Sequence, residues 1–160
     1  MSDEDKSSKT YKILLIEDDE QNIQNALEAF KDHEVLVAKT LQEAEEILDK
    51  HYPDFIISDL NFPTKLGEQP TNQEENILKL LEKRKTVCLV LTGGVYHHDK
   101  KGIKIMLYSP YVSTPLELKL LYGDKKTPEI YRKSIDLLEQ NVHFEEIVNA
   151  IKRYRKFVGG

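Results

Sequence analysis

Short apolar runs alternate with amphipathic stretches through the first 95 residues of the chain. The run KILLI, residues 12–16, is continuous and followed by acidic residues, a pattern typical of a strand buried on both faces. Three further apolar runs, at residues 35–37, 55–57 and 87–91, have the length of strands. Between the runs, apolar residues recur every three or four positions, which predicts amphipathic helices.

Two capping-box patterns, Thr40–Glu43 and Thr71–Glu74, predict where two of these helices begin. Strand and helix therefore alternate four times in about 80 residues, which indicates a parallel sheet with helices on both faces. We expect an α/β fold in which residues 11–160 form a single domain. The polar, charged segment at residues 1–10 has nothing to bury, and we expect a disordered tail there.

The composition is that of a globular protein in a reducing compartment. Of the 160 residues, 39% are hydrophobic and 32% charged, which suits one soluble domain. The net charge of −5 does not favour nucleic acid as a partner, because duplex binding needs a basic field. Cys88 is the single cysteine, so neither a disulfide framework nor a cysteine zinc site is expected. No apolar stretch approaches the roughly 18 residues of a membrane span, and the N-terminus does not resemble a signal peptide, which predicts a cytoplasmic protein without a membrane partner.

Acidic and polar residues stand at the ends of three predicted strands. Glu17 and Asp18 follow the first strand, Asp59 and Asn61 follow the third, and Thr92 follows the fourth. In parallel sheets with helices on both faces, ligands bind at the carboxyl ends of the strands. Crowded carboxylates repel one another unless a cation lies between them, and a few hard oxygen ligands suit Mg²⁺. A carboxylate beside such a metal can act as a nucleophile towards a phosphoryl group.

A simpler interpretation applies to each acid taken singly. Acids at strand ends commonly cap helices or form turns, and either Asp18 or Asp19 would suit the start of the next helix. The order and spacing of the whole set are what favour a site.

The segments IEDDEQN, SDLNFPTKLG and LVLTGG, in that order, resemble the signatures of response-regulator receiver domains, the family of the chemotaxis regulator. Pro63 and Gly67 lie four and eight positions after Asp59, as in the phosphoacceptor segment of that family. Asp59 lies 41 positions after Asp18, and Thr92 follows Asp59 by 33, with GEQPTNQ as a candidate insertion. The resemblance implies a flavodoxin-like, doubly wound, five-stranded parallel sheet with helices on both faces.

The resemblance also assigns roles. It implies that Glu17 and Asp18 are metal-binding acids and that Asp59 is both the phosphoacceptor and a metal ligand. The backbone carbonyl of Asn61 would complete the protein ligands of a Mg²⁺ ion. Thr92 would supply the hydroxyl that contacts the phosphoryl group.

One element of the family pattern is missing. The family places a Lys at the end of strand five, where its charge pairs with the phosphoryl group. Residues 103–108 and 111–113 are both candidates for strand five, and they are followed by Ser109 and Thr114 instead. Three lysines offer themselves as substitutes from elsewhere in the chain: Lys100, Lys101 and Lys104.

The C-terminal part is longer than a minimal receiver requires. Residues 116–140 are interpreted as an insertion or extra helix, with Thr127 as cap and Pro128 in the first helical position. An additional C-terminal helical segment is expected to pack on the sheet through an apolar stripe: Phe144, Ile147, Val148, Ile151 and Tyr154.

The resemblance implies a stand-alone receiver that takes a phosphoryl group from a sensor histidine kinase or phosphotransfer protein and signals by contact with a downstream protein. Such a domain is not a turnover enzyme, although it helps to catalyse its own phosphorylation and dephosphorylation. The missing Lys leaves an alternative, a pseudo-receiver that binds proteins without being phosphorylated. An aspartate-nucleophile phosphatase is a weaker third hypothesis. Those enzymes have an Asp-x-Asp motif at the end of the first strand, whereas here the candidate nucleophile, Asp59, follows the third strand and has Asn61 two positions later.

Overall fold

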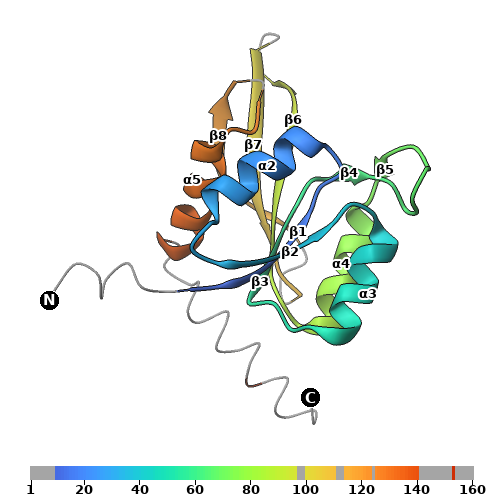
Figure 1. Ribbon diagram of the computed structural model, residues 1–160. Helices are drawn as coiled ribbons and strands as arrows, with labels where there is room; N and C mark the ends of the chain where they lie inside the picture. Colours follow the sequence, from blue (N-terminus) through green and yellow to red (C-terminus); the bar gives the residue numbers. More distant parts are fainter. Residues whose placement is uncertain (1–9, 97–99, 111–113, 124, 141–152, 154–160) are drawn as a thin grey trace, which may run out of the picture.

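A six-stranded mixed sheet forms the centre of the protein, with helices on both of its faces (Figure 1). The structure, a computed structural model, describes residues 10–96, 100–110, 114–123, 125–140 and 153. The strands lie in the order β2-β1-β3-β6-β7-β8. Their bounds are β1 Lys12–Ile16, β2 Glu34–Ala38, β3 Phe55–Ser58, β6 Cys88–Tyr96, β7 Lys100–Tyr108 and β8 Leu116–Tyr122.

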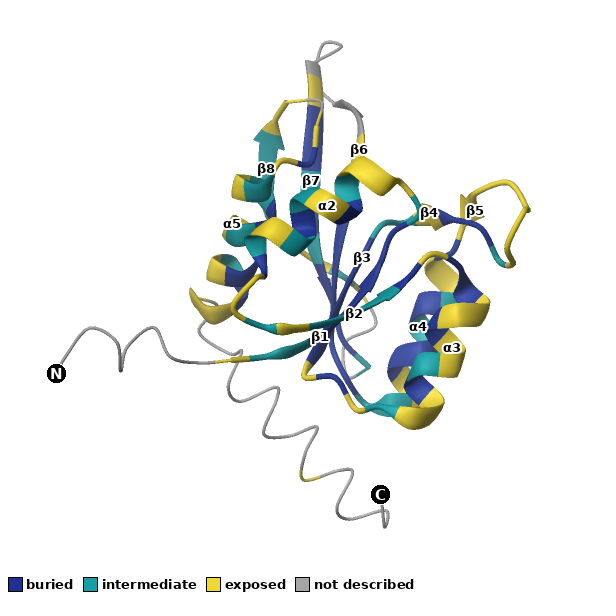
Figure 2. Cartoon of the chain, in the orientation of Figure 1, coloured by how far each residue is buried: buried dark blue, intermediate teal, exposed yellow. Residues whose placement is uncertain are grey.

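The first four strands in this order are parallel, and they are the four that the apolar runs predict. All four residues of β3 and four of the five in β1 are buried, because helices cover both faces of the sheet there (Figure 2). The α/β character and the mostly parallel sheet expected from the sequence are therefore confirmed.

The expectation of five parallel strands is wrong in strand number and in the direction of β7. The fourth strand does not end at Thr92 but continues to Tyr96 and pairs antiparallel with β7. Only residues 97–99 separate the two strands, and so short a connection joins antiparallel neighbours, whereas a parallel crossover needs a dozen or more residues. Candidate strand 103–108 lies within β7, and candidate 111–113 lies outside the described residues.

The segment 116–140 contributes to both the sheet and the helices. It contains β8, which pairs antiparallel with β7, and helix α5, Pro128–Gln140. The Thr127 hydroxyl accepts a hydrogen bond from the Ile130 N–H at 3.3 Å, so Thr127 caps α5 as expected. Apart from Arg153, the expected C-terminal helical segment lies outside the described residues.

In the described part of the chain, four helices cover the sheet in two pairs. Helices α2 (Glu20–Ala29) and α5 pack on one face, over a core that includes Ile13, Leu15 and Tyr131. Helices α3 (Leu41–Lys50) and α4 (Glu74–Arg84) pack on the other face, with Leu14, Ile16 and Val90 in their core. None of the helices in the described part of the chain has the length and apolarity to span a bilayer.

The two capping-box predictions have different outcomes. Thr40 caps α3, and its side chain accepts a hydrogen bond from the Glu43 N–H at 3.1 Å. Thr71 instead lies in β5 (Thr71–Asn72), which forms a short hairpin with β4 (Asn61–Phe62). Helix α4 begins later, after Gln73, because the hairpin extends the chain through the position that the pattern assigned to the cap.

Candidate functional site

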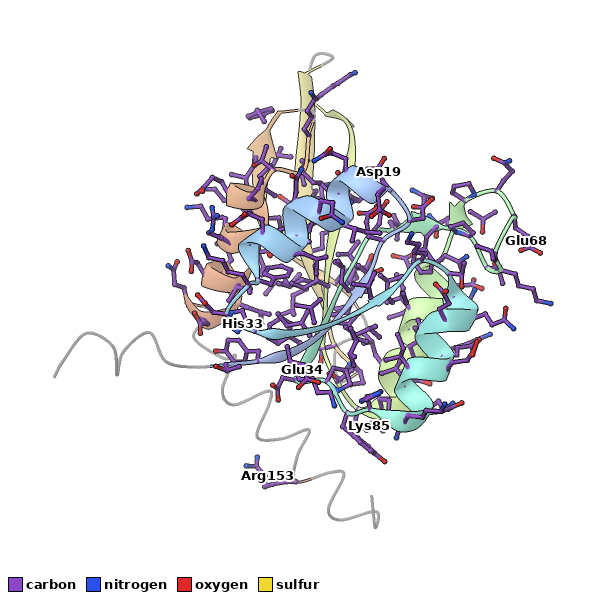
Figure 3. All side chains as sticks on the ribbon, viewed as in Figure 1. Asp19, His33, Glu34, Glu68, Lys85 and Arg153 are labelled. Atoms are coloured by element: carbon purple, nitrogen blue, oxygen red, sulfur yellow. The ribbon has the colours of Figure 1, made fainter. Side chains whose placement is uncertain are left out.

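Three carboxylates converge at the carboxyl edge of the parallel strands. One ligand oxygen from each of Glu17, Asp18 and Asp59 lies within 4.8 Å of the others. The register explains this meeting, because Ile16 pairs with Ser58 and the next residues of β1 and β3 leave the sheet side by side. The Asp59 N–H also donates to the Ile16 carbonyl at 3.0 Å, which ties the two strand ends together. In Figure 3, Asp19 marks this edge, whereas Glu34 and Lys85 mark the opposite one.

The alternation of side chains along the strands divides the cluster between the two faces. Leu15 and Ile57 belong to the core under α2 and α5, so Glu17 and Asp59, two positions later on each strand, lie on that side. The Glu17 side chain is 2% exposed and that of Asp59 is 21% exposed. Asp18, the next residue after Glu17, lies on the other side and is half-buried. The site is therefore a partly open acidic pocket with one acid deep inside it.

A cation reaches this pocket from residues 116–140, which the sequence analysis interpreted as an insertion or extra helix and did not connect with the site. The Lys126 ammonium lies 3.2 Å from Glu17 Oε1 and 3.3 Å from Asp59 Oδ1. Lys126 stands between β8 and α5, and its side chain is 9% exposed. A signal for it was present, since Lys126 directly precedes the Thr127-Pro128 helix start at which the sequence predicts a new helix.

The substitutes suggested by the sequence have other surroundings. Lys104 forms an ion pair with Glu117 at 3.3 Å, and Lys101 is exposed. The side chain of Lys100 lies outside the described part of the structure. No Lys follows residues 103–108 or 111–113, as the sequence shows, but a cation does reach the acids from elsewhere: Lys126, which lies after β8 and before α5.

Both carboxylate oxygens of Glu17 accept hydrogen bonds. Oε1 accepts from Lys126 and, at 3.5 Å, from the buried Tyr131 hydroxyl of α5, while Oε2 accepts from the Asp19 N–H at 3.2 Å. Burial raises the pKa of Glu17, and the charge of Lys126 opposes part of that rise. Burial, followed by the Glu17 charge, also raises the pKa of Tyr131, so this phenol remains a donor.

The question of which acid caps α2 is resolved in favour of Asp19. Its Oδ1 accepts a hydrogen bond from the Asn22 N–H at 2.9 Å, and it is the N-cap residue. Asp18 belongs to the three-carboxylate cluster instead. The pKa of Asp18 is raised by burial and by the neighbouring carboxylates of Asp59 and Asp19. A cation bound beside Asp18 would offset its repulsion from these carboxylates.

The donor set fits a hard divalent cation. With all groups ionised, three carboxylates and the Lys126 ammonium leave the described side chains of the cluster with a formal charge of −2. One Mg²⁺ ion would neutralise that charge and would find the oxygen ligands that it prefers. Glu17 has both of its oxygens engaged, by Lys126, Tyr131 and Asp19. The contacts of Asp59 with Lys126 and the Leu60 N–H involve Oδ1 alone, so Asp18 and Asp59 are the acids better placed to hold such an ion directly.

The backbone carbonyl of Asn61 is compatible with the role that the resemblance implies. The Leu60 carbonyl accepts from the Gln73 N–H at 2.9 Å, and the Phe62 carbonyl accepts from Gln73 Nε2 at 2.8 Å. Asn61 pairs with Asn72 between these two positions, so its own carbonyl is directed away from β5.

Thr92 lies on β6, half-buried and paired with Lys104 of β7. Because Ser58 pairs with Val90, Thr92 stands just beyond the level at which β3 ends. Among the described residues, no hydrogen bond joins Thr92 to Asp59. The structure thus brings Glu17, Asp18 and Asp59 together and places Thr92 on the adjacent strand.

Comparisons with known proteins complete the description. No protein-family model matches the chain, and a search of curated proteins also found no match. Among solved structures, the chain is similar to the crystal structure of the response regulator PhyR from Brucella abortus, at 17% sequence identity and a TM-score of 0.44. The match covers 53% of this chain and 33% of that chain, so the chain spans about a third of that protein's length.

Proposed function

We propose that this chain is a receiver-type phosphoacceptor domain in which Asp59 takes a phosphoryl group in a Mg²⁺-dependent reaction. The observation that carries the proposal is the pocket itself, in which Glu17, Asp18 and Asp59 meet and Lys126 bridges two of them. A purely structural ion pair would need one acid for one lysine, whereas this pocket holds two acids more than its lysine neutralises.

Each residue has a defined part in the proposed reaction. A carboxylate oxygen of Asp59 attacks the phosphorus atom, an O–P bond forms, and the bond from phosphorus to the donor breaks with its electron pair staying on the donor. Mg²⁺, when bound, offsets the negative charge of the transferring oxygens. Lys126 already lies at hydrogen-bond distance from Asp59, so its ammonium is placed to donate to a phosphoryl oxygen there. Thr92 is assigned the hydroxyl contact on the β6 side.

The proposed phosphoryl donor is a sensor histidine kinase or a phosphotransfer protein, and the proposed output is contact with a downstream protein. The pseudo-receiver alternative rested on the missing strand-five Lys. Lys126 brings a cation to the acids from another part of the chain, which supports the phosphoacceptor over this alternative.

Intact mass spectrometry tests the proposal directly. The protein is incubated with acetyl phosphate and Mg²⁺, and one phosphoryl adduct is expected. The adduct is expected to disappear in Asp59→Asn and when Mg²⁺ is chelated. Asp19→Asn is the matched control, because Asn also caps helices well and Asp19 is the cap of α2. A wild-type mass that stays unchanged while Mg²⁺ is present would favour the pseudo-receiver.

A further inference from the structure

A side chain of α2 holds the main chain of Lys126. Asn25 lies half-buried on α2, and its Nδ2 donates to the Lys126 carbonyl oxygen at 2.9 Å. Its Oδ1 accepts from Gln21 Nε2 at 3.1 Å. A carbonyl can only accept, so the amino group of Asn25 must face Lys126, and the bond from Gln21 to the amide oxygen fits the same orientation.

An anchor matters here because Lys126 lies outside the regular elements, between the end of β8 and the start of α5. Gly123, three positions earlier, has φ +149°, a conformation that favours glycine, and β8 ends at Tyr122. On the other side, the Thr127 cap begins α5. A lysine side chain has four rotatable bonds and loses much entropy when its ammonium is held in one place. When the main chain of Lys126 is fixed, its ammonium can reach fewer positions, so less entropy is lost on holding it between Glu17 and Asp59.

We propose that Asn25 is a positioning residue, which holds Lys126 so that its ammonium reaches Glu17 and Asp59 together. The ammonium lies 3.2 Å from one acid and 3.3 Å from the other, so a small displacement of the main chain breaks one of the two contacts. Because Asn25 is on α2 and Lys126 precedes α5, the packing of these two helices sets the geometry of the pocket. The consequence for phosphoryl transfer rests on the proposed function, whereas the anchoring of Lys126 does not.

The first test is a double-mutant cycle on the rate of phosphorylation by acetyl phosphate with Mg²⁺. Asn25→Leu keeps the size of the side chain and removes the donor, and we expect a rate about fivefold lower, as for the loss of one hydrogen bond. Lys126→Met should lower the rate further, and adding Asn25→Leu to it should change nothing more. Gln24→Leu is the control, since Gln24 is an exposed amide on the same helix and bonds only to Glu20 among the described residues. An equal loss from Asn25→Leu in both backgrounds would overturn the proposal.

The second test does not depend on phosphorylation. The Lys126 ammonium is followed by NMR, where hydrogen exchange of a buried, ion-paired ammonium is slow. Asn25→Leu, and independently Asn25→Ala, should speed this exchange about fivefold while the amide spectrum of the rest of the protein stays unchanged. Exchange that is unaffected in both folded variants would refute the anchoring role. If no variant gains a phosphoryl group but the exchange responds as expected, the proposed function fails and the positioning of Lys126 stands.

Discussion

Lys126 donates to Glu17 at 3.2 Å across 109 positions of sequence, and this contact joins the segment that precedes α5 to the residue that follows β1. It also changes the expected electrostatics of the acidic pocket. Without a cation, three close carboxylates would be mutually repulsive and partly buried. With Lys126 present, the protein carries part of the compensation itself and leaves the remaining negative charge for a bound ion.

Replacing Lys126 should therefore cost stability that Mg²⁺ partly restores. Lys126→Met leaves the buried Glu17 without its charged partner, and we expect a loss of about 2–4 kcal/mol in the free energy of unfolding. The measurement is urea unfolding with and without Mg²⁺. Lys104→Met is the matched control, because the more exposed Lys104–Glu117 pair should contribute less than about 1 kcal/mol. Equal losses in the two variants would contradict the special role of Lys126.

Asp18→Asn should stabilise the metal-free protein. Asp18 lies in the cluster, and no salt bridge links it to Lys126, so amidation removes repulsion from Asp59 without breaking an ion pair. We expect a gain on the order of 1 kcal/mol in the free energy of unfolding. Added Mg²⁺ at ten times its Kd should stabilise the wild type by about 1.4 kcal/mol and this variant much less. Thermal melts measure both effects, and a wild type that is indifferent to Mg²⁺ would count against a metal site.

The gain from Asp18→Asn should grow with pH. Burial and neighbouring carboxylates raise the pKa of Asp18 above its ordinary value of 3.8, and burial raises that of Glu17 above 4.5. The folded state therefore binds protons more tightly than the unfolded chain, and its stability falls as pH rises from these ordinary values through the raised ones. In the absence of metal, the difference between variant and wild type should be small near about pH 4 and largest near about pH 8. A difference that shrinks with rising pH would mean that the charged form of Asp18 is favoured in the folded state.

Two buried tyrosines should respond differently to loss of their hydroxyl groups. The Tyr108 hydroxyl donates to Glu74 at 2.7 Å, whereas the Tyr131 hydroxyl lies 3.5 Å from Glu17. A short hydrogen bond to a carboxylate is stronger, so Tyr108→Phe should cost about 1.5 kcal/mol and Tyr131→Phe less than about 1 kcal/mol. The Tyr131 ring keeps its edge contact with Phe30 in either case. Chemical denaturation of both variants gives the comparison, and a larger loss in Tyr131→Phe would show that the Glu17 contact is tighter than its distance indicates.

Much of the parallel half of the fold could be predicted from local pattern. The apolar runs correspond to β1, β2, β3 and β6, and the signal is strongest in β1 and β3, since a strand buried on both faces must be apolar at nearly every position. The sequence also predicts that the acids after β1 and β3 lie close together, because neighbouring parallel strands end at the same edge of the sheet. Thr71–Glu74 shows the limit of such patterns. The same four residues satisfy a capping box, yet tertiary pairing with Asn61 and Phe62 draws Thr71 into a strand.

The sequence by itself determined the elements whose signal is local: apolar periodicity, helix caps, and acids that follow a buried run. Only the tertiary structure decided the direction of β7 and the source of the cation. Strand direction depends on how the chain connects and pairs, and the alternating residues of β7 suit either direction equally. The position of Lys126 depends on the pairing of β7 and β8, which precede it in the chain, and on the hydrogen bond from Asn25 of α2 to its carbonyl. A contact between residues 109 positions apart leaves no periodicity in the sequence, because it exists only when the intervening elements have packed.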